Sequence, residues 1–474
     1  MSSIQISREK LQTNPIFRVL TSTSDTLGVD AYVIGGFVRD IFLHRLSKDI
    51  DVVCVGNGIS LAKEVAKSLG SASLILFKNY GTAQLKYRDI AIEFVGARKE
   101  SYSWAFRNPI VEEGSLEDDI KRRDFTINTL AICINQNRFG ELIDIFDGLT
   151  DLEECSIRTP LDPDITFSDD PLRMLRAIRF ASQLGFFIES KTFESIGNNC
   201  NRINIVSRER IVDELNKIIL SPRPSVGFEL LEKTGLLRLI LPELTALKGI
   251  ETREGIGHKD NFNHTLAVVD NLAKVSNKLW LRWAALLHDI GKPLVKRFNY
   301  RCGWTFHGHE CKGAEMLKKI FRRMRMPINN NLQYVEKLVF LHMRPIVLSD
   351  NEVTDSAIRR LLFEASDDID DLMMLCEADI TSKNLGKVKQ FLYNFKLVRN
   401  KLKSIEEKDR VRNFQPPIDG VEIMKMFSLP ASKKIGELKL ALKEAILDGE
   451  IPNEYEAAHN YLINLAKQRG IVED

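Results

Sequence analysis

The spacing of the apolar residues changes near residue 160, and this change limits the folds open to the chain. Before it, short runs rich in Val, Ile and Phe, separated by Gly, Asn and Asp, predict strands. The runs are AYVIGG (31–36), DIDVVCV (49–55), SLILF (73–77), GTAQLKY (81–87) and IAIEFVG (90–96). After it, segments 171–186, 207–220 and 317–324 place apolar residues three or four apart, as amphipathic helices do. The sequence predicts an α+β fold, with a small sheet domain followed by nearly all helix.

Composition excludes some classes of protein. With 474 residues, the chain has room for about two to four domains. Its 67 basic and 65 acidic residues are nearly balanced, so net charge neither requires nor excludes a polyanionic partner. Seven cysteines without a CxxC pair argue against a disulfide framework. No run approaches the roughly 18 apolar residues of a membrane span, and the first residues lack a signal-peptide core. We expect a cytoplasmic protein without a membrane partner.

Two aspartates one residue apart lie in the second predicted strand. Because side chains alternate along a strand, Asp49 and Asp51 project to the same face. Paired carboxylates there suit Mg²⁺ ions that activate an attacking hydroxyl and neutralise a triphosphate. Glu93, in the run IAIEFVG, is the expected third carboxylate. The alternative is an ordinary exposed strand end.

Two glycines end the first predicted strand. Gly35 and Gly36 allow the backbone to approach a phosphate closely. The following helix, FVRDIFLHRL, then directs its N-terminal N–H groups and Arg39 toward that anion. An ordinary turn is the alternative, but the order strand, GlyGly, helix, strand and DxD favours a nucleotidyltransferase.

Five ordered motifs, between about residues 30 and 245, resemble those of class II tRNA nucleotidyltransferases and bacterial poly(A) polymerases, within the DNA polymerase β superfamily. They are GGFVRD with DID, RRDFTIN (122–128), IDIFDGLTDL (143–152), DDPLRMLRAIRF (169–180) and SRERIVDELNKII (207–219). The resemblance implies a polymerase β-like head (1–160) and an all-α neck that selects the nucleotide and binds RNA (161–250). It also implies Mg²⁺ as cofactor, and tRNA, CTP and ATP as partners.

The same resemblance assigns roles to individual side chains. It implies that Arg123, Asp124 and Asn128 hold the ribose and phosphates, and that Arg176 faces the nucleotide. One departure is visible, because Asp169 stands where the family usually has Glu.

Asp170 and Arg173 stand where the family reads the base. They are three residues apart at a helix start and hence on one face. A carboxylate accepts from an exocyclic amine while a guanidinium donates to the adjacent ring nitrogen. Cytosine and adenine present that edge, whereas uracil and guanine present the reverse, so the pair selects CTP and ATP without a template. Each good match is worth roughly 1–3 kcal/mol. The alternative is a plain salt bridge between the two.

A second set of residues follows the order H, HD, H, H, D of HD-domain metal phosphohydrolases. Its members are His264, His288, Asp289, His309, His342 and Asp379. Imidazole and carboxylate ligands suit several divalent transition metals, so the metal stays open. The other histidines nearby, His258 and His307, are expected to lie outside the ligand set. We assign an HD-type helical domain to 251–385 and a helical, tRNA-binding tail to 386–474, where Lys433, Lys434 and a helix start near Ile435 face phosphates.

These patterns predict a CCA-adding tRNA nucleotidyltransferase with HD-domain phosphohydrolase activity. Three alternatives stay open: a poly(A) polymerase, an enzyme that adds only CC or only A, and an HD phosphohydrolase whose front half only binds RNA. LILFKNYGTAQL lacks the basic segment associated with the polymerases, and the intact DID argues against the third. The segment 97–115, interpreted as a full-length loop, favours addition of all three nucleotides.

Overall fold

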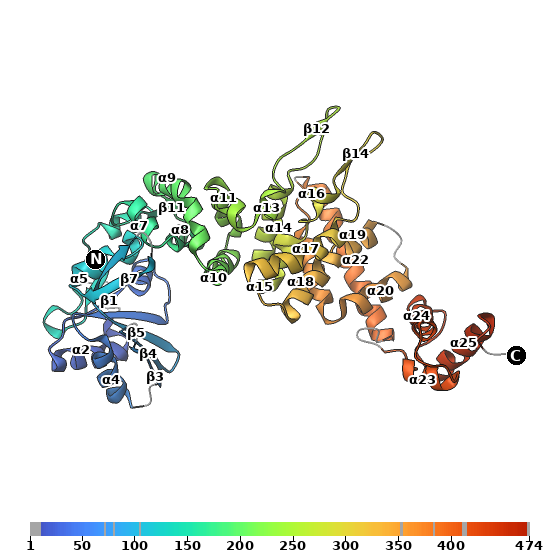
Figure 1. Cartoon of the computed structure of the whole chain (residues 1–474), viewed down its shortest axis with the longest axis horizontal. Coiled ribbons are helices and arrows are strands. Elements are labelled where there is room, and N and C mark those ends of the chain that lie inside the picture. The colour runs from blue at the N-terminus through green and yellow to red at the C-terminus, as the bar shows by residue number, and fades with distance from the viewer. Residues whose placement is uncertain are drawn as a thin grey trace. The chain divides into compact units, whose positions relative to one another are not determined.

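The computed structural model describes residues 11–70, 73–78, 81–103, 106–350, 354–382, 384–409 and 415–471. The chain divides into two compact units, Met1–Pro242 and Glu243–Asp474. Figure 1 shows the strands of a large sheet in the first unit and mainly helices in the second. The division lies close to the predicted boundary at residue 250, and the finer boundaries at 160 and 385 stay predictions.

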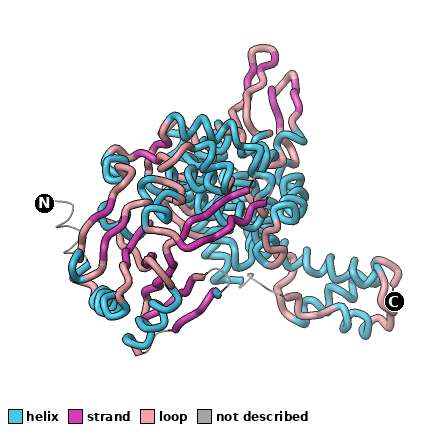
Figure 2. Tube along the Cα trace, turned by 60° about the vertical axis from the view of Figure 1, so that its left-hand side comes forward, coloured by secondary structure: helices cyan, strands magenta, loops and turns pink. Residues whose placement is uncertain are grey.

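A seven-stranded sheet forms the centre of the first unit, in the order β3-β4-β5-β2-β1-β8-β9. β2 and β5 run parallel, and the other neighbours are antiparallel. The strands are β1 (Ala31–Ile34), β2 (Asp49–Cys54), β3 (Ser73–Phe77), β4 (Thr82–Tyr87), β5 (Ile90–Gly96), β8 (Ala131–Cys133) and β9 (Leu142–Ile143). Figure 2 shows them as neighbouring magenta segments.

Helices cover this sheet and extend beyond it. α4 (Gly58–Leu69) contacts α2 (Pro15–Leu27), β4 and β5, and α3 (Gly36–Phe42) connects β1 to β2. The remaining helices are α5 (Leu116–Lys121), α6 (Gly148–Glu153), α7 (Pro163–Asp169), α8 (Leu172–Leu184), α9 (Ser190–Asn199), α10 (Arg208–Ile219), α11 (Pro224–Lys233) and α12 (Leu236–Ile240). α8 and α10 pack together because each presents an apolar stripe, with Leu175, Ile178, Ile211 and Leu215 fully buried.

The second unit is built mainly from helices. They are α14 (Asn261–Ala273), α15 (Leu279–Leu287), α16 (Lys292–Val295), α17 (His309–Met324), α18 (Asn330–Leu341), α19 (Met343–Asp350), α20 (Asp355–Ala365), α21 (Ile369–Ala378), α22 (Leu385–Asp409), α23 (Gly420–Met426), α24 (Lys433–Asp448) and α25 (Tyr455–Gln468); α13 (Pro242–Thr245) spans the division. Buried Arg282 donates to the carbonyls of Ala273 and Ser276, which satisfies the end of α14.

Most of the predicted elements are confirmed. All five early runs are strands, the three helical segments are helices, and the α+β class is correct. Segment 97–115 is not a loop, because it contains the hairpin of β6 (Arg98–Ser103) and β7 (Phe106–Glu113). Two further hairpins, β12 (Thr252–Arg253) with β13 (Ile256–Gly257) and β14 (Arg297–Asn299) with β15 (Gly303–Thr305), interrupt the expected all-helical half. Short, polar strands of this kind lack the apolar runs that predicted the others.

Within the described ranges, no helix combines the length and apolarity needed to cross a membrane.

Candidate functional site

Three acidic side chains lie on one face of the parallel strands β2 and β5. The register pairs Asp51 with Glu93, and Asp49 lies two residues earlier on β2. Burial raises the pKa of Asp51, although nearby Arg123 lowers it. Burial and the Asp51 carboxylate raise the pKa of Glu93. The two raised pKa values mean that Asp51 and Glu93 do not readily carry negative charge at the same time. A divalent cation would offset the repulsion between the two carboxylates, and carboxylate oxygens are suitable ligands for it.

Gly35 ends β1 with φ +78, a value that a residue with a side chain rarely adopts. A Cβ here would lie 3.1 Å from both Asp51 Oδ2 and Arg123 Nη1. Glycine therefore lets the Asp51 carboxylate and the Arg123 guanidinium lie close to the backbone. A Cβ at Gly36 would lie 3.6 Å from Arg39 Nη2, which is ordinary contact.

A cavity of about 340 Å³ connects these carboxylates to the helical neck. Its charged lining comprises Asp51, Glu93, Arg98, Arg122, Arg123, Asp124, Asp170, Arg173, Arg176 and Arg210. Six arginines and four carboxylates thus face one space, and the excess of cations suits a polyphosphate. Seven of the predicted site residues of the head and neck, from segments far apart in the sequence, line this cavity: Asp51, Glu93, Arg123, Asp124, Asp170, Arg173 and Arg176. The other five are not among its lining residues: Asp49, Gly35, Gly36, Arg39 and Asn128.

A buried hydrogen-bond chain supports this cavity. Arg39 donates to Asn128 Oδ1 (2.9 Å), Asn128 Nδ2 donates to Asp124 Oδ1 (3.0 Å), and Arg176 donates to Asp124 Oδ2 (2.6 Å). Burial raises the pKa of Asp124, but Arg176 and Asn128 outweigh it and hold that pKa at about 2. Arg39 also pairs with Asp40 at 2.9 Å and does not line the cavity. Its guanidinium therefore lies behind Asn128 and not in the position predicted for direct anion contact.

Asp170 and Arg173 both line the cavity. These two described side chains do not form the salt bridge with each other that was the alternative to base reading. Asp170 Oδ2 accepts from Arg210 at 3.0 Å, and its Oδ1 accepts from the N–H of Leu172. Arg173 donates to the carbonyl of Arg122 at 2.7 Å. Each of the two predicted base-reading side chains is thus held by a separate partner and not by the other.

Sequence reasoning missed Phe180 and Arg210. The guanidinium carbons of Arg39, Arg176 and Arg179 lie 5.1, 5.6 and 4.2 Å from the Phe180 ring centre. Arg179 also pairs with Glu214 on α10 at 3.3 Å, so it is partnered and not solvated. These contacts join α8 to other elements, and helical spacing alone carries no signal for them.

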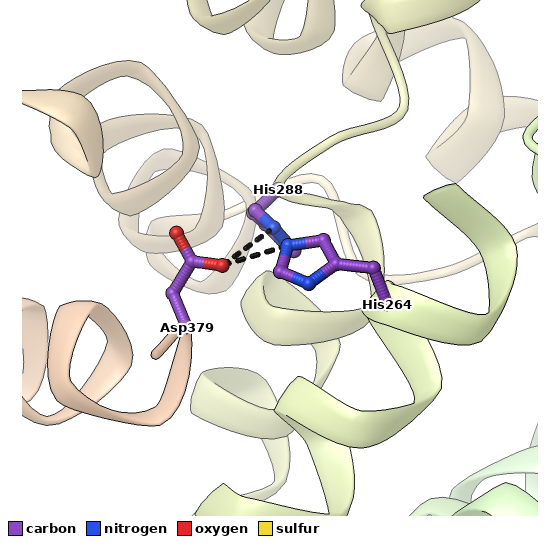
Figure 3. Close-up of side chains that lie close together, drawn as sticks. All are labelled: His264, His288 and Asp379. Carbon is purple, nitrogen blue, oxygen red and sulfur yellow. Dashed lines mark ion pairs between the residues drawn. The ribbon is translucent and has the colours of Figure 1, made fainter. Parts of the chain in front are cut away.

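The six predicted HD ligands converge in the second unit. They form two adjoining sets, His264 with His288 and Asp379, and Asp289 with His309 and His342, and within each set the donor atoms lie within 4.8 Å of one another. Figure 3 shows His264 and His288 directed at Asp379. His264 Nε2 lies 2.8 Å from Asp379 Oδ1, and His309 Nε2 lies 3.3 Å from Asp289 Oδ1. Each of the four histidines and Asp289 is buried.

Backbone carbonyls fix how three of these histidines present their rings. The Nδ1 atom of His288 lies 2.7 Å from the carbonyl oxygen of Ala285. That of His309 lies 2.9 Å from the carbonyl oxygen of Phe306, and that of His342 lies 2.6 Å from the carbonyl oxygen of Val339. A carbonyl can only accept, so Nδ1 carries the proton and Nε2 offers its lone pair to the centre. Burial lowers the pKa of His342 to about 3, which keeps that imidazole neutral, as a ligand must be.

Asp379 Oδ1 lies 2.8 Å from His264 Nε2 and 3.7 Å from His288 Nε2. Within the described residues, neither Asp379 Oδ1 nor His288 Nε2 forms a hydrogen bond of regular geometry. Polar atoms left in this way are costly unless something else binds them, and a divalent cation fits both. The centre opens to a cavity of about 620 Å³, lined in part by Lys259, Lys292 and Phe306. His307 also lines the cavity, whereas His258 packs against the rings of Trp304 and Phe306, and neither belongs to the two ligand sets.

Three family models match the chain, in the order of these sites. Residues 31–158 match the Poly A polymerase head domain, 185–248 the probable RNA and SrmB-binding site of polymerase A, and 261–384 the HD domain.

Curated relatives match nearly the whole chain. A CC-adding tRNA nucleotidyltransferase of Thermus thermophilus is 30% identical over 90% of this chain and 92% of its own. An A-adding tRNA nucleotidyltransferase of Deinococcus radiodurans is 31% identical over 90% of this chain and 94% of its own.

Solved structures share the fold. A tRNA nucleotidyltransferase complexed with a primer tRNA and an incoming ATP analog has a TM-score of 0.57 at 26% identity, covering 80% of this chain and 99% of that one. A CCA-adding enzyme with ATP has a TM-score of 0.65 at 23% identity, covering 98% of both chains.

The sheet, its carboxylates and the arginine-lined cavity define a nucleotidyltransferase with an appended HD domain. The chain belongs to the class II CCA-adding tRNA nucleotidyltransferase family.

Proposed function

We propose that this enzyme adds C, C and A to the 3′ end of tRNA, using CTP and ATP. One observation carries the proposal: a single cavity of about 340 Å³ contains Asp51 and Glu93 at one part of its wall and Asp170 and Arg173 at another. A nucleotide placed there has its phosphates near the carboxylates and its base at the two readers. The nearby arginines supply positive charge along the triphosphate.

The chain's own residues explain the selection of nucleotide. Asp170 accepts from the exocyclic amine of cytosine or adenine, and Arg173 donates to the adjacent ring nitrogen. Arg210 and the Arg122 carbonyl hold these two side chains, so their polarity does not reverse to suit uracil or guanine. The buried chain through Asp124 and Asn128 keeps Arg176 beside the nucleotide.

Asp49, Asp51 and Glu93 are the residues that would hold Mg²⁺. The bound ion would neutralise charge on the triphosphate and favour the deprotonated 3′ hydroxyl of the RNA. Gly35 contributes by letting Asp51 and Arg123 lie against the backbone, where both face the phosphates.

Product length decides between full and partial addition. The two relatives that match over nearly the whole chain differ in specificity, one CC-adding and one A-adding. Purified protein is incubated with tRNA lacking CCA, lacking only A, or complete, in the presence of all four NTPs, each labelled in turn. We expect extension by three, one and no nucleotides. Extension by two on the first substrate would identify a CC-adding enzyme, extension only on the second an A-adding enzyme, and long A tracts a poly(A) polymerase.

A second activity, metal-dependent phosphohydrolysis, is favoured by the convergence of six ligand-type residues, five of them buried, and by two atoms among them that form no regular hydrogen bond within the described residues. His264, His288, Asp289, His309, His342 and Asp379 would hold a divalent transition metal, which supplies a hydroxide at neutral pH. Lys259 and Lys292, at the cavity wall, suit a phosphate group. Substrates with a 2′,3′-cyclic or terminal phosphate on RNA fit the enzyme's other activity, because such ends block the 3′ hydroxyl that the head extends.

Metal content and hydrolysis test this second activity. The protein as purified is expected to contain a divalent transition metal and to hydrolyse 2′,3′-cyclic AMP and cyclic-ended tRNA. His288→Ala combined with Asp289→Ala is expected to lose both properties while nucleotide addition continues. Metal-free wild-type protein, or hydrolysis that survives the double change, would leave the HD domain with a structural role only.

The C-terminal helices are proposed to contact tRNA. α24 begins at Lys433, whose side chain is 93% exposed, whereas Ile435 is buried. Exposed cations at a helix N-terminus suit phosphate, and the buried isoleucine anchors that end of the helix.

A further inference from the structure

Two β-hairpins extend side by side from the helices of the second unit. Figure 1 shows the β12 and β14 hairpins reaching away from the helices in the same direction. The contact between β13 and β15 joins them. A two-stranded hairpin is marginal alone in water, so these two need packing partners.

Aromatic rings in the interior of the pair supply that packing. Trp304 Nε1 donates to the carbonyl of Ile256 at 3.1 Å, which links the second hairpin to the first. The Trp304 ring lies 5.2 Å from Phe298 and 5.5 Å from His258, edge to face. These half-buried rings account for how the hairpins hold together.

Tyr300 packs edge to face against Phe298, with ring centres 5.6 Å apart, and still leaves most of its side chain exposed. Tyr300, at the hairpin tip, is 70% exposed. The guanidinium of Arg253 lies 5.5 Å from its ring centre and 5.1 Å from that of Phe298, and donates to the Tyr300 hydroxyl at 3.1 Å. An exposed ring ordered by a stacked guanidinium offers a flat surface and a positive charge together.

The charge of the segment is one-sided. From Lys292 to His309 the chain contains four cations, four aromatic residues and no carboxylate. The first hairpin adds one exposed carboxylate, Glu254, and Glu251 just before that hairpin pairs with Lys296 at 2.6 Å.

The surface continues into the HD cavity. The ring centres of Phe306 and His258 lie 5.8 Å apart. Phe306 also lines the HD cavity, and Lys292 Nζ lies 5.6 Å from the centre of its ring. A polyanion that follows these rings therefore reaches the HD centre.

We propose that the double hairpin (residues 252–257 and 297–305) binds single-stranded RNA. Bases stack on the exposed ring of Tyr300 and on the guanidinium of Arg253, and phosphates pair with Arg297 and Arg301. Stacking on a ring does not depend on the identity of the base, so the surface reads no sequence. This RNA binding does not depend on the proposed hydrolytic activity of the HD centre.

The test uses the full chain and a 12-nucleotide single-stranded RNA carrying 4-thiouridine. Ultraviolet crosslinking followed by peptide mapping is expected to place the RNA on residues 297–305. Tyr300→Leu is expected to lower the affinity of the double hairpin for the RNA about tenfold. The crosslink yield, measured at the RNA concentration that half-saturates the wild-type protein, is expected to fall accordingly. Arg301→Gln removes a cation proposed to pair with phosphate and is expected to lower the slope of log affinity against log salt by about one.

Tyr393→Leu is the matched control, because Tyr393 is 58% exposed on α22 of the same unit. We expect it to bind the RNA as wild type does. Thermal unfolding and nucleotide addition are measured for each variant, and neither is expected to change. RNA crosslinks found only outside the hairpins, or equal affinity of Tyr300→Leu and wild type at every salt concentration, would overturn the proposal.

Discussion

The two sites of this chain handle charge in opposite ways. The head cavity contains more arginines than carboxylates and is open enough to accept a triphosphate. The HD centre is built from four histidines and two aspartates, nearly all buried, with their donor atoms directed at one another. The excess of arginines in the first suits an anion, whereas the convergent imidazole and carboxylate groups of the second suit a cation.

The difference extends to how each site is supported. In the head, a buried chain of side chains from Arg39 to Arg176 holds the polar groups in place. In the HD centre, backbone carbonyls orient the imidazole rings. A substitution in the head therefore disturbs several neighbours, whereas one in the HD centre mainly removes a ligand.

Asp51→Asn gives the largest expected effect. Removing one metal-facing charge is expected to slow nucleotide addition at least about a thousandfold, a loss of several kcal/mol of transition-state stabilisation. Single-turnover extension of tRNA measures it. Asp49→Asn is expected to behave similarly, and Glu93→Gln to be severe.

Hydrolysis of 2′,3′-cyclic AMP by the same Asp51→Asn protein is expected to be unchanged, because the HD centre shares none of these residues. Asp30→Asn, an exposed aspartate just before β1, is the matched control and should extend tRNA normally. Wild-type addition by folded Asp51→Asn would contradict the metal assignment.

Asp124→Asn is expected to weaken folding of the head. The folded-state pKa of Asp124 is about 2, below the usual value near 4. A depressed carboxyl pKa contributes stability that is present above the unfolded pKa and is lost as pH falls from about 4 to about 2. The change should lower the free energy of unfolding at pH 7 by about 2 kcal/mol and flatten its pH dependence below pH 4.

Unfolding followed at pH 2 to 7 checks this, with Asp213→Asn on the exposed face of α10 as control. An unaltered pH profile in Asp124→Asn would mean that the buried chain does not depend on this charge.

Several elements of the fold could be predicted from the sequence because they depend on the local spacing of apolar residues. β1 and β2 have strong apolar runs, and α8 and α10 have clear helical spacing. The hairpins at 98–113, 252–257 and 297–305 were missed, because polar strands paired only with each other carry no apolar alternation.

The sites divide in the same manner. The gathering of the six HD residues, and the place of Asp51 beside Glu93, could be expected from motif order and residue type. Their roles as metal ligands stay predictions. The contact of Arg210 with Asp170, and the place of Arg39 behind Asn128, could not, since each depends on how distant elements pack. Helical spacing suggested a pair between Asp170 and Arg173, and tertiary partners took precedence.

Loss of base selection is the next expected effect. In Asp170→Ala or Arg173→Ala, the remaining reader does not impose polarity, so UTP and GTP are incorporated more and CTP and ATP less. The ratio of kcat/KM for CTP over UTP is expected to fall about ten- to a hundredfold, in line with roughly 1–3 kcal/mol per bidentate match. Asp213→Ala and Arg238→Ala, exposed on neighbouring helices, are matched controls. A uniformly slower enzyme with unchanged selectivity would make the pair structural.

Removal of the tail gives the smallest expected effect. It is expected to weaken binding of tRNA but not of the small nucleotides used at the head and at the HD centre. Ending the chain at Phe414, which lies outside the described residues, removes α23, α24 and α25. Because Lys433 and Lys434 are proposed to contact phosphates, tRNA affinity should fall about tenfold and depend less steeply on salt. Nucleotide binding at the head and hydrolysis of 2′,3′-cyclic AMP at the HD centre should persist, since neither small molecule reaches the tail. Arg360 pairs with Asp448 at 2.9 Å, so α20 loses a partner and thermal unfolding must be followed in parallel. A folded, truncated protein that binds tRNA as tightly as the full chain at every salt concentration would exclude the tail from the contact with RNA.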